Sequence, residues 1–250
     1  MEIGDRTDEA AATVLDLDPA TSALVVDTDG LADVFARLAV ELHESDGVEE
    51  TVQAVVEFAL QAVSCSYAGV ALATRGRPEV PAVTDPVVGE ILQWQMVSRE
   101  GPLVESMSEH RTLLIRDTVT DGRWPDWAAK VLSLGVRTVL DVPLATSGGT
   151  VGVLGLYSAA PDAFDDDDEA VAQILARHAS VAVASARREE SLGQAVDARK
   201  LVGQAMGILM ERYNVDGDRA FAILKRYSQD TNTKLRDVAQ QLIDTRKLPK

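Results

Sequence analysis

The chain has 250 residues and is 46% hydrophobic, enough for one large domain or two ordinary ones with packed cores. The formal net charge of −16 argues against a nucleic-acid partner for the chain as a whole, and a single cysteine, Cys65, excludes a disulfide framework. The charge is unevenly distributed: residues 1–186 hold 11 basic and 31 acidic residues, whereas residues 198–250 hold 11 basic and 6 acidic residues. The chain therefore has an acidic body and a basic C-terminal piece.

No apolar run approaches the ~20 residues that a membrane-spanning helix needs, and the N-terminus MEIGDRTDEA lacks the features of a signal peptide. These features predict a cytoplasmic protein with no membrane partner. The histidines His43, His110 and His178 form no metal-binding pattern, and no catalytic constellation is visible. We therefore expect no enzyme activity and no metal site, and the sequence identifies no cofactor.

In chain order, residues 1–28 read as an acidic flexible leader with one short strand at Ala23–Val26. Apolar residues at helical spacing then predict helices at Leu31–Glu44 and Val48–Val63. Shorter elements follow, in this order: a strand at Ser66–Ala73, a returning strand at Val80–Val83, helices at Val87–Met96 and Gly101–Glu109, a strand at Thr112–Ile115, a loop at Asp117–Pro125, and paired strands at Val136–Leu144 and Thr150–Ser158 joined by a loop at Ala145–Gly149.

From Glu169 the chain reads as helical for more than forty residues, and the acid run Asp165–Asp168 suits the start of that helix. This order predicts an α+β fold, an antiparallel sheet with packed helices. On strand 136–144, Arg137 and Asp141 share a face, which favours a salt bridge between them.

Three sequence marks lie in this body: Glu100-Gly101-Pro102, Arg123-Trp124-Pro125 and Val151-Gly152-Val153-Leu154. With the element order, they resemble a GAF domain over about residues 29–186. The resemblance implies a sensor of a small ligand or signal, with a pocket between the sheet and the short helices. Candidate wall residues of that pocket are Trp94, His110, Arg111, Trp124 and Trp127; the alternative is that the tryptophans are core and the histidine is at the surface. Cys65 reads as a small buried apolar residue.

The long helix carries a heptad-like series that predicts either a parallel homodimer seam or packing of the helix against its own domain. The series is Leu192, Ala195, Arg199, Val202, Met206, Leu209 and Tyr213, and the predicted seam contacts are Leu192, Val202, Met206 and Leu209.

Two short helices follow, at Asp218–Ser228 and from Leu235, after a long helix that ends near Arg212. The three helices should share one core that includes Ala220, Phe221, Leu224, Leu235, Val238 and Ala239. The stretch GQAMGILMERYNVDGDRAFAILKRYSQDTNTKLRDVAQQLI resembles an ANTAR domain, the RNA-binding module of bacterial transcription antiterminators, over about residues 197–247. The family often has Lys where this chain has Met206, so a basic contact there is missing or moved.

The resemblances together imply a leader (1–28), a GAF-like sensor (29–186) and an ANTAR-like RNA-binding domain (187–250) that shares the long helix. Proteins of this kind bind paired RNA hairpins in nascent leader transcripts, so that transcription reads through a terminator. Candidate RNA-binding residues are Arg199, Lys200, Gln204, Arg219, Lys225, Arg226, Ser228, Asn232, Lys234 and Arg236.

Alternatives remain open for some of these residues. Asn232 and Thr233 could cap a helix, and Tyr227 could be partly core instead of stacking on a base. A rival function is a DNA-binding transcription factor, because two short helices after a turn can mimic a helix-turn-helix. A second rival, an enzyme under a GAF sensor, needs more than the fifty helical residues that remain.

Overall fold

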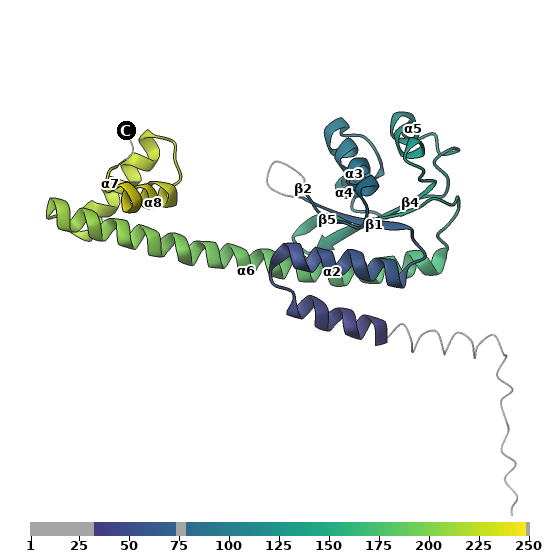
Figure 1. Cartoon of the computed structure of the whole chain (residues 1–250), viewed down its shortest axis with the longest axis horizontal. Helices are drawn as coiled ribbons and strands as arrows, with labels where there is room; N and C mark the ends of the chain where they lie inside the picture. Colours follow the sequence, from purple (N-terminus) through teal and green to yellow (C-terminus); the bar gives the residue numbers. More distant parts are fainter. Residues whose placement is uncertain (1–32, 74–78, 249–250) are drawn as a thin grey trace, which may run out of the picture.

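The computed structural model describes residues 33–73 and 79–248. The predicted leader, its strand at Ala23–Val26 and the first two residues of the predicted helix Leu31–Glu44 lie outside these ranges. The described residues form an α+β structure with a five-stranded antiparallel sheet, which confirms the predicted fold class (Figure 1). Its order is β2-β1-β5-β4-β3. The strands are β1 (Tyr67–Leu72), β2 (Glu79–Val83), β3 (Leu113–Ile115), β4 (Thr138–Thr146) and β5 (Gly149–Ser158).

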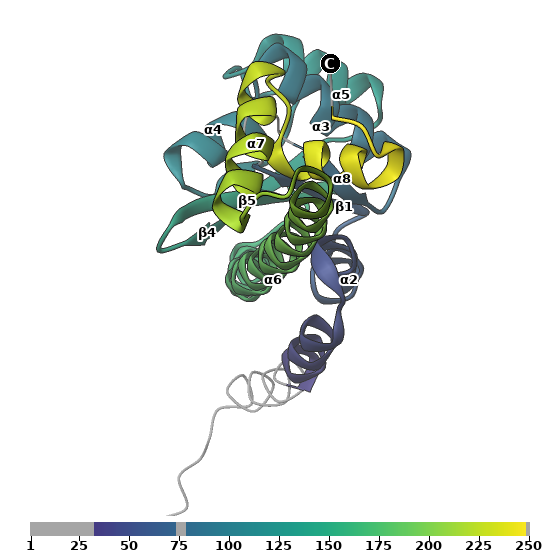
Figure 2. The ribbon, with the colours of Figure 1, turned by 90° about the vertical axis from the view of Figure 1, so that its left-hand side faces the viewer.

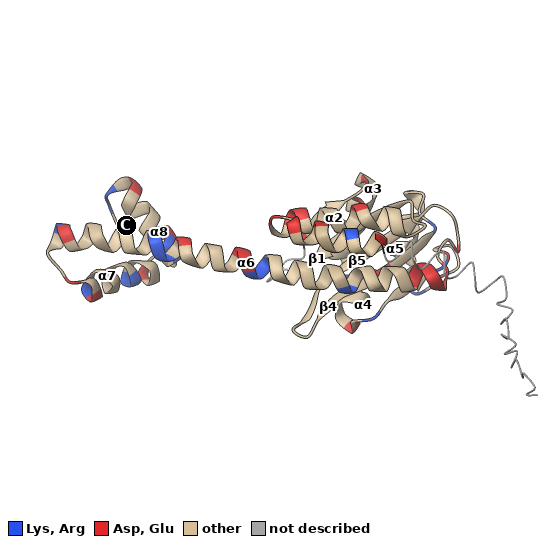
Figure 3. Ribbon diagram, turned by 90° about the horizontal axis from the view of Figure 1, so that it is seen from below, with Lys and Arg blue, Asp and Glu red and all other residues tan. Residues whose placement is uncertain are grey.

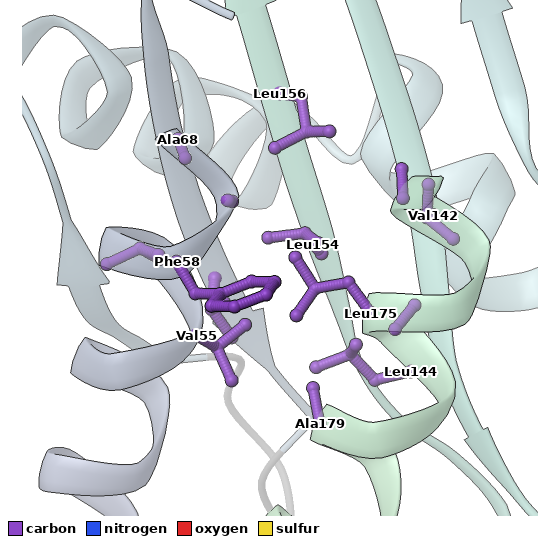
Figure 4. Close-up of a cluster of buried hydrophobic side chains, with 14 of the residues drawn as sticks. Val55, Phe58, Ala68, Val142, Leu144, Leu154, Leu156, Leu175 and Ala179 are labelled. Carbon is purple, nitrogen blue, oxygen red and sulfur yellow. The ribbon is translucent and has the colours of Figure 1, made fainter. Parts of the chain in front are cut away.

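One face of the sheet is covered by helix α2 (Gly47–Ala62) and by the first half of α6 (Asp166–Tyr213), and a helix over 33–44 packs beside them. Strand residues alternate between the two faces of a sheet, so every second residue of β4 and β5 points toward these helices. Figure 4 shows the core that results, in which Phe58 from α2 meets Leu154 from β5 and Leu175 from α6. Because the apolar residues of α2 and α6 recur at helical spacing, both helices could be predicted from the sequence.

Three short helices cover the opposite face: α3 (Pro86–Ser98), α4 (Pro102–Glu109) and α5 (Pro125–Ser133). The sequence prediction missed α5, which has only nine residues and follows a stretch that reads as loop. Proline occupies the start of all three helices, where its missing N–H costs nothing. Gly101, which precedes α4, has φ +121°, and a Cβ there would collide with the Gln95 side chain. Glycine is therefore required at this position.

Helix α6 is 48 residues long and begins with a capping box, because the Asp165 carboxylate accepts a hydrogen bond from the Asp168 amide and the Asp168 carboxylate accepts one from the Asp165 amide. The predicted reading of the acid run as a helix start is confirmed. Beyond the sheet, α6 continues into a second unit with α7 (Gly217–Asp230) and α8 (Leu235–Thr245). Figure 2, which looks along α6, shows α7 and α8 on the same side of it as the sheet.

Two details of the sequence reading are wrong. Arg137 forms its ion pair with Asp117, at 2.6 Å, and not with Asp141. Four residues of strand span about 13 Å, too far for a direct pair even on a shared face. The β4–β5 hairpin is also tighter than the predicted five-residue loop, because Thr146 already pairs with Gly149.

Among the described residues, no helix is both long and apolar enough to cross a membrane. Within the same ranges, no three His, Cys, Asp or Glu residues are grouped so that they could hold a metal ion.

Candidate functional site

The C-terminal part of α6 packs with α7 and α8 into a three-helix unit, here called the helical module. Its fully buried core agrees with the predicted core except at two positions: Leu235 is only partly buried, and Phe221 is 41% exposed. On α7, Phe221 lies at the edge of the apolar face and beside Lys225, one turn later, so part of its ring reaches solvent. The core residues are Ala205, Leu209, Ala220, Leu224, Val238, Ala239 and Leu242.

Nine of the ten predicted RNA-binding residues are exposed on this module, and Ser228 is half-buried. Two of the cations have ion partners on their own helix: Arg226 lies 3.4 Å from Asp230, and Arg236 lies 3.1 Å from Asp237. Exposed pairs of this kind are weak and exchange readily with other anions. Within the described part of the chain, no ion pair engages the remaining cations, Arg199, Lys200, Arg219, Lys225 and Lys234.

The polar residues of the α7–α8 turn have structural roles. The Ser228 hydroxyl donates to the Thr233 carbonyl at 2.7 Å, and the Thr233 amide donates to the Ser228 carbonyl at 3.0 Å. Asn232 has φ +50° and is exposed. Neither Asn232 nor Thr233 caps α8, whose N-cap is Lys234 with no side-chain hydrogen bond. Ser228 thus closes the turn, while Asn232 is exposed at its tip.

The predicted residues do not form a single patch. Arg219 and Arg226 share one side of α7, since they are seven residues apart. Gln204 faces a groove between the ends of α6 and α8. Lys234 lines a different groove of about 860 Å³, which also includes Asp46, Glu49 and Glu190 from the sensor side. Figure 3 shows Lys and Arg gathered where α6 passes α8, and Asp and Glu at the start of α6.

Glu190 ties α6 to the start of α2 at this groove. Its carboxylate accepts a hydrogen bond from the Val48 amide at 2.8 Å, and Gly47 approaches the same carboxylate with φ +81°. A Cβ at Gly47 would lie 2.9 Å from the carboxylate oxygen. An acid at the N-terminus of a helix satisfies amides that otherwise have no partner. The contact therefore fixes α6 against the sensor immediately before the helix leaves it.

On the sensor, the face between the sheet and α3–α5 holds the predicted pocket tryptophans. Trp127 and Trp124 are buried with their rings 5.9 Å apart, and Trp94 is half-buried in the same apolar cluster. The other two candidates lie outside this layer. His110 is exposed and contacts the Thr150 hydroxyl, while Arg111 is exposed and forms ion pairs with Glu105 and Glu109.

The sequence reasoning missed the polar groups of this layer. In the described residues, six buried side-chain atoms have no hydrogen-bond partner, and they come from five elements that surround one face of the sheet. An unpaired buried polar group typically costs about 1–3 kcal/mol, so each of these atoms calls for a polar partner. The atoms are Gln95 Nε2, Ser106 Oγ, Trp127 Nε1, both carboxylate oxygens of Asp141, and Tyr157 Oη.

Asp141 and Tyr157 meet above Gly155, which lies opposite Asp141 on the neighbouring strand. A Cβ on Gly155 would lie 2.9 Å from an Asp141 carboxylate oxygen and closer still to the Tyr157 hydroxyl, so only glycine leaves room for both. Burial raises the pKa of Asp141 to about 8. Burial, with a further contribution from Asp141, also raises the pKa of Tyr157. No aromatic or histidine pattern in the sequence marks this pair.

Cys65 is half-buried, and burial raises the pKa of its thiol to about 11. The thiol is directed to the Ala59 carbonyl at 3.8 Å. A thiol with a raised pKa is a poor nucleophile, which agrees with the predicted structural role.

Comparison with known families and structures matches both units. The GAF domain family model matches residues 47–183, and the ANTAR domain family model matches residues 190–243. Among curated proteins, none matches the chain.

Two similar solved structures each cover about two thirds of this chain. The GAF domain of a phosphoenolpyruvate-protein phosphotransferase from Coxiella burnetii is 16% identical, with a TM-score of 0.51 over 64% of this chain and 96% of that chain. The chromophore-binding domain of a bacteriophytochrome from R. palustris is 8% identical, with a TM-score of 0.53 over 65% of this chain and 63% of that chain. At such identities these likenesses support the fold alone.

Proposed function

This chain belongs to the GAF family and continues into an ANTAR domain, and we propose that it is a signal-responsive transcription antitermination regulator that binds hairpins in nascent RNA. In this proposal residues 187–250 bind the RNA, and residues 29–186 sense the signal. The protein acts in the cytoplasm, as a homodimer, and catalyses no reaction. The GAF and ANTAR pairing is the architecture of a regulator, and the RNA-binding role follows from the ANTAR family.

The observation that carries the RNA role is the exposure of unpaired cations on a small, fully packed module. Ala205, Leu224 and Val238 complete the core, and none of the candidate RNA-binding Lys and Arg residues belongs to it. Lys and Arg on a helical surface neutralise phosphates, and exposed polar tips such as Asn232 can reach the edges of splayed loop bases. The acidic sensor, by contrast, repels RNA.

The experiment is a competition between an RNA hairpin and a DNA duplex of equal charge, measured with the full chain at fixed salt. We expect the hairpin to bind at least 10-fold more tightly. Preference for the duplex would support the rival DNA-binding function instead. Crosslinking to cellular RNA, followed by sequencing, would then identify the regulated transcripts.

A second observation supports a small-molecule signal. The unpaired atoms around Asp141 and Tyr157 comprise several donors and one carboxyl group, so they suit a small polar ligand rich in acceptor atoms. Calorimetric titration of the full chain with a metabolite set should find a ligand whose affinity falls at least 10-fold in Tyr157→Phe. The matched control is Tyr213→Phe, which changes an exposed tyrosine in the helical module. If no ligand shows this difference, the proposed small-molecule signal at Tyr157 is refuted.

A further inference from the structure

A groove of about 800 Å³ lies between the end of α6 and the end of α8 in the helical module. Its apolar sides are Ile208 on α6 and Ile243 on α8, which are half-buried against the core of the module. Its polar lining consists of exposed side chains, namely Gln204, Glu211, Arg212 and Arg246. Apolar sides with a few polar groups are the usual composition of a small-molecule site.

The groove is open at Gly207, in the middle of its α6 side. Gln204, Gly207 and Glu211 lie on one side of the helix, because residues three and four apart face the same way. At a rise of 1.5 Å per residue, Gln204 and Glu211 are about 10 Å apart along the helix axis, and Gly207 leaves a gap between them. A Cβ on Gly207 would meet nothing within 4 Å, so the packing of this chain does not require a glycine. Glycine weakens the interior of a helix but allows a ligand to approach the backbone closely.

The charged groups of the groove have no ion partners. Within residues 33–73 and 79–248, no ion pair engages Glu211, Arg212 or Arg246. Arg212 donates to the Arg246 carbonyl at 2.6 Å, which satisfies a carbonyl at the end of α8 and holds Arg212 in place. Glu211 from α6 and Arg246 from the end of α8 therefore offer an acceptor and a donor on opposite sides of the groove.

These two groups distinguish between nucleobases. A carboxylate only accepts hydrogen bonds, and a guanidinium only donates them. Guanine has two adjacent donors, N1–H and the N2 amino group, which a carboxylate can accept together, and its acceptors O6 and N7 pair bidentately with Arg. No other RNA base has both features. An acid also repels phosphates, so Glu211 suits the edge of a base and not the backbone of a nucleic acid.

We propose that the groove between α6 and α8 binds a guanine base. Glu211 accepts from N1–H and N2, Arg246 donates to O6 and N7, and the gap at Gly207 admits the ring between the two isoleucines. The base can come from an unpaired guanosine of an RNA or from a free guanine nucleotide, and Arg212 suits a phosphate of either. The guanine site rests on the helical module alone, whereas RNA as its source rests on the proposed function.

The first test compares the two sources on the full chain. Calorimetric titration with guanosine monophosphate, against adenosine monophosphate, examines the free nucleotide. Selection from a hairpin library with randomised loops, followed by sequencing, examines the RNA. We expect guanine to be favoured at least 10-fold over adenine, either at one loop position or between the two monophosphates. The arm with the preference identifies the source, and no preference in either arm overturns the inference.

The second test is Glu211→Gln, which keeps the size of the side chain and replaces an acceptor by a donor. We expect the preference for guanine to fall at least 10-fold. If Glu211 only repelled phosphates, the same change would strengthen binding to every RNA and leave the preference intact, which would overturn its role. Glu189→Gln changes an exposed glutamate of α6 outside the groove and, as the matched control, should preserve the preference.

The third test is Gly207→Ala, with Gly193→Ala as the matched control on the same helix. A Cβ at either position meets no atom of this chain within 4 Å, so both variants should fold. We expect guanine binding to weaken at least 5-fold in Gly207→Ala and to be unchanged in Gly193→Ala. Unchanged binding in Gly207→Ala overturns the inference, and an altered sedimentation rate would then show that the gap faces a second chain.

The inference and the proposed function can fail separately. Binding of guanosine monophosphate without any hairpin binding would keep the guanine site and refute the RNA-binding function. Hairpin binding without a base preference, and without binding of guanosine monophosphate, would refute the guanine site and keep the proposed function.

Discussion

Asp141 provides a direct test of the sensor core, because its carboxyl group is fully buried and no hydrogen bond satisfies it within the described residues. We consider the substitution Asp141→Asn, which keeps the shape of the side chain and removes its titration. Burial raises the pKa of Asp141 to about 8, whereas an aspartate in an unfolded chain titrates near 3.9. The folded protein therefore holds a proton at pH 7 that the unfolded chain has released.

The sign of the pH dependence follows from this difference. Since the unfolded state binds fewer protons between about pH 4 and pH 8, the free energy of unfolding decreases as pH rises through that window. At 1.36 kcal/mol per pH unit, the loss reaches about 4 kcal/mol at pH 7. Asn carries no such cost, so the variant should be more stable than the wild type at pH 7 and similar to it at pH 4.

The assay is thermal unfolding of the full chain between pH 4 and pH 8, read from the transition of the sensor. A change of about 4 kcal/mol corresponds to roughly 10 °C in Tm for a domain of this size. Asp126→Asn, an exposed aspartate on α5, is the matched control and should follow the wild type. If Asp141→Asn and the wild type show the same pH dependence, Asp141 is not buried without a partner, and the argument for a polar ligand above it is refuted.

Three further outcomes are expected. Replacing Lys225 and Arg226 with Ala should weaken hairpin binding, and the slope of log K against log salt should flatten by about 0.7 for each phosphate that is no longer neutralised. The matched control, Arg37→Ala with Arg177→Ala, changes two exposed arginines of the sensor half and should alter neither the affinity nor the slope. An unchanged slope in the Lys225/Arg226 variant would remove these two residues from the RNA site. Glu190→Ala leaves the Val48 amide without its carboxylate, so the sensor should lose about 1 kcal/mol of stability in denaturant unfolding, whereas Glu189→Ala should have no comparable effect on monomers. Cys65, with a pKa of about 11, should react with iodoacetamide at pH 8 at least 10-fold more slowly in the folded chain than in urea, and equal rates would contradict its burial.

The elements that could be predicted from the sequence are those whose apolar residues repeat at the period of the element. Helix α2 follows an i, i+3, i+4 series, and its buried residues include Val52, Val55, Val56 and Ala59. The helices of the module were predictable for the same reason. Helix α5 was not, because its nine residues directly follow a stretch that reads as loop.

The polar site could not be predicted, because its members come from five elements that meet only after folding. Asp141 lies in an apolar strand, and its sequence neighbour Arg137 offered a plausible partner that the strand geometry rules out. The signal in the sequence was Gly155, one of the glycines inside strand β5. Such a glycine can indicate close approach of other groups.

The predicted seam shows how one helix can carry two overlapping patterns. Val202, Met206 and Leu209 follow heptad spacing, but Leu209 is fully buried in the core of the helical module and the other two pack against it. These three residues therefore hold α7 and α8, as the alternative of packing within the same domain anticipated, and Leu209 cannot contact a second chain. Of the predicted contacts, Leu192 alone is exposed. The exposed fraction of each side chain shows which residues of α6 pack within this chain and which face solvent, whereas their spacing alone does not.

The same strands connect the sensor site to α6. Asp141 faces the polar layer, while its neighbours on β4, Leu140 and Val142, face the opposite side and pack in the cluster that contains Leu175 and Ala179 of α6. A ligand that donates to Asp141 favours its charged form, and the strand must accommodate that charge. Because interior packing is dense, a shift of β4 is felt at the face on which α6 lies. Glu190 holds α6 to α2 two residues before Leu192, where the helix leaves the sensor, so we expect such a shift to alter the direction in which α6 carries the helical module.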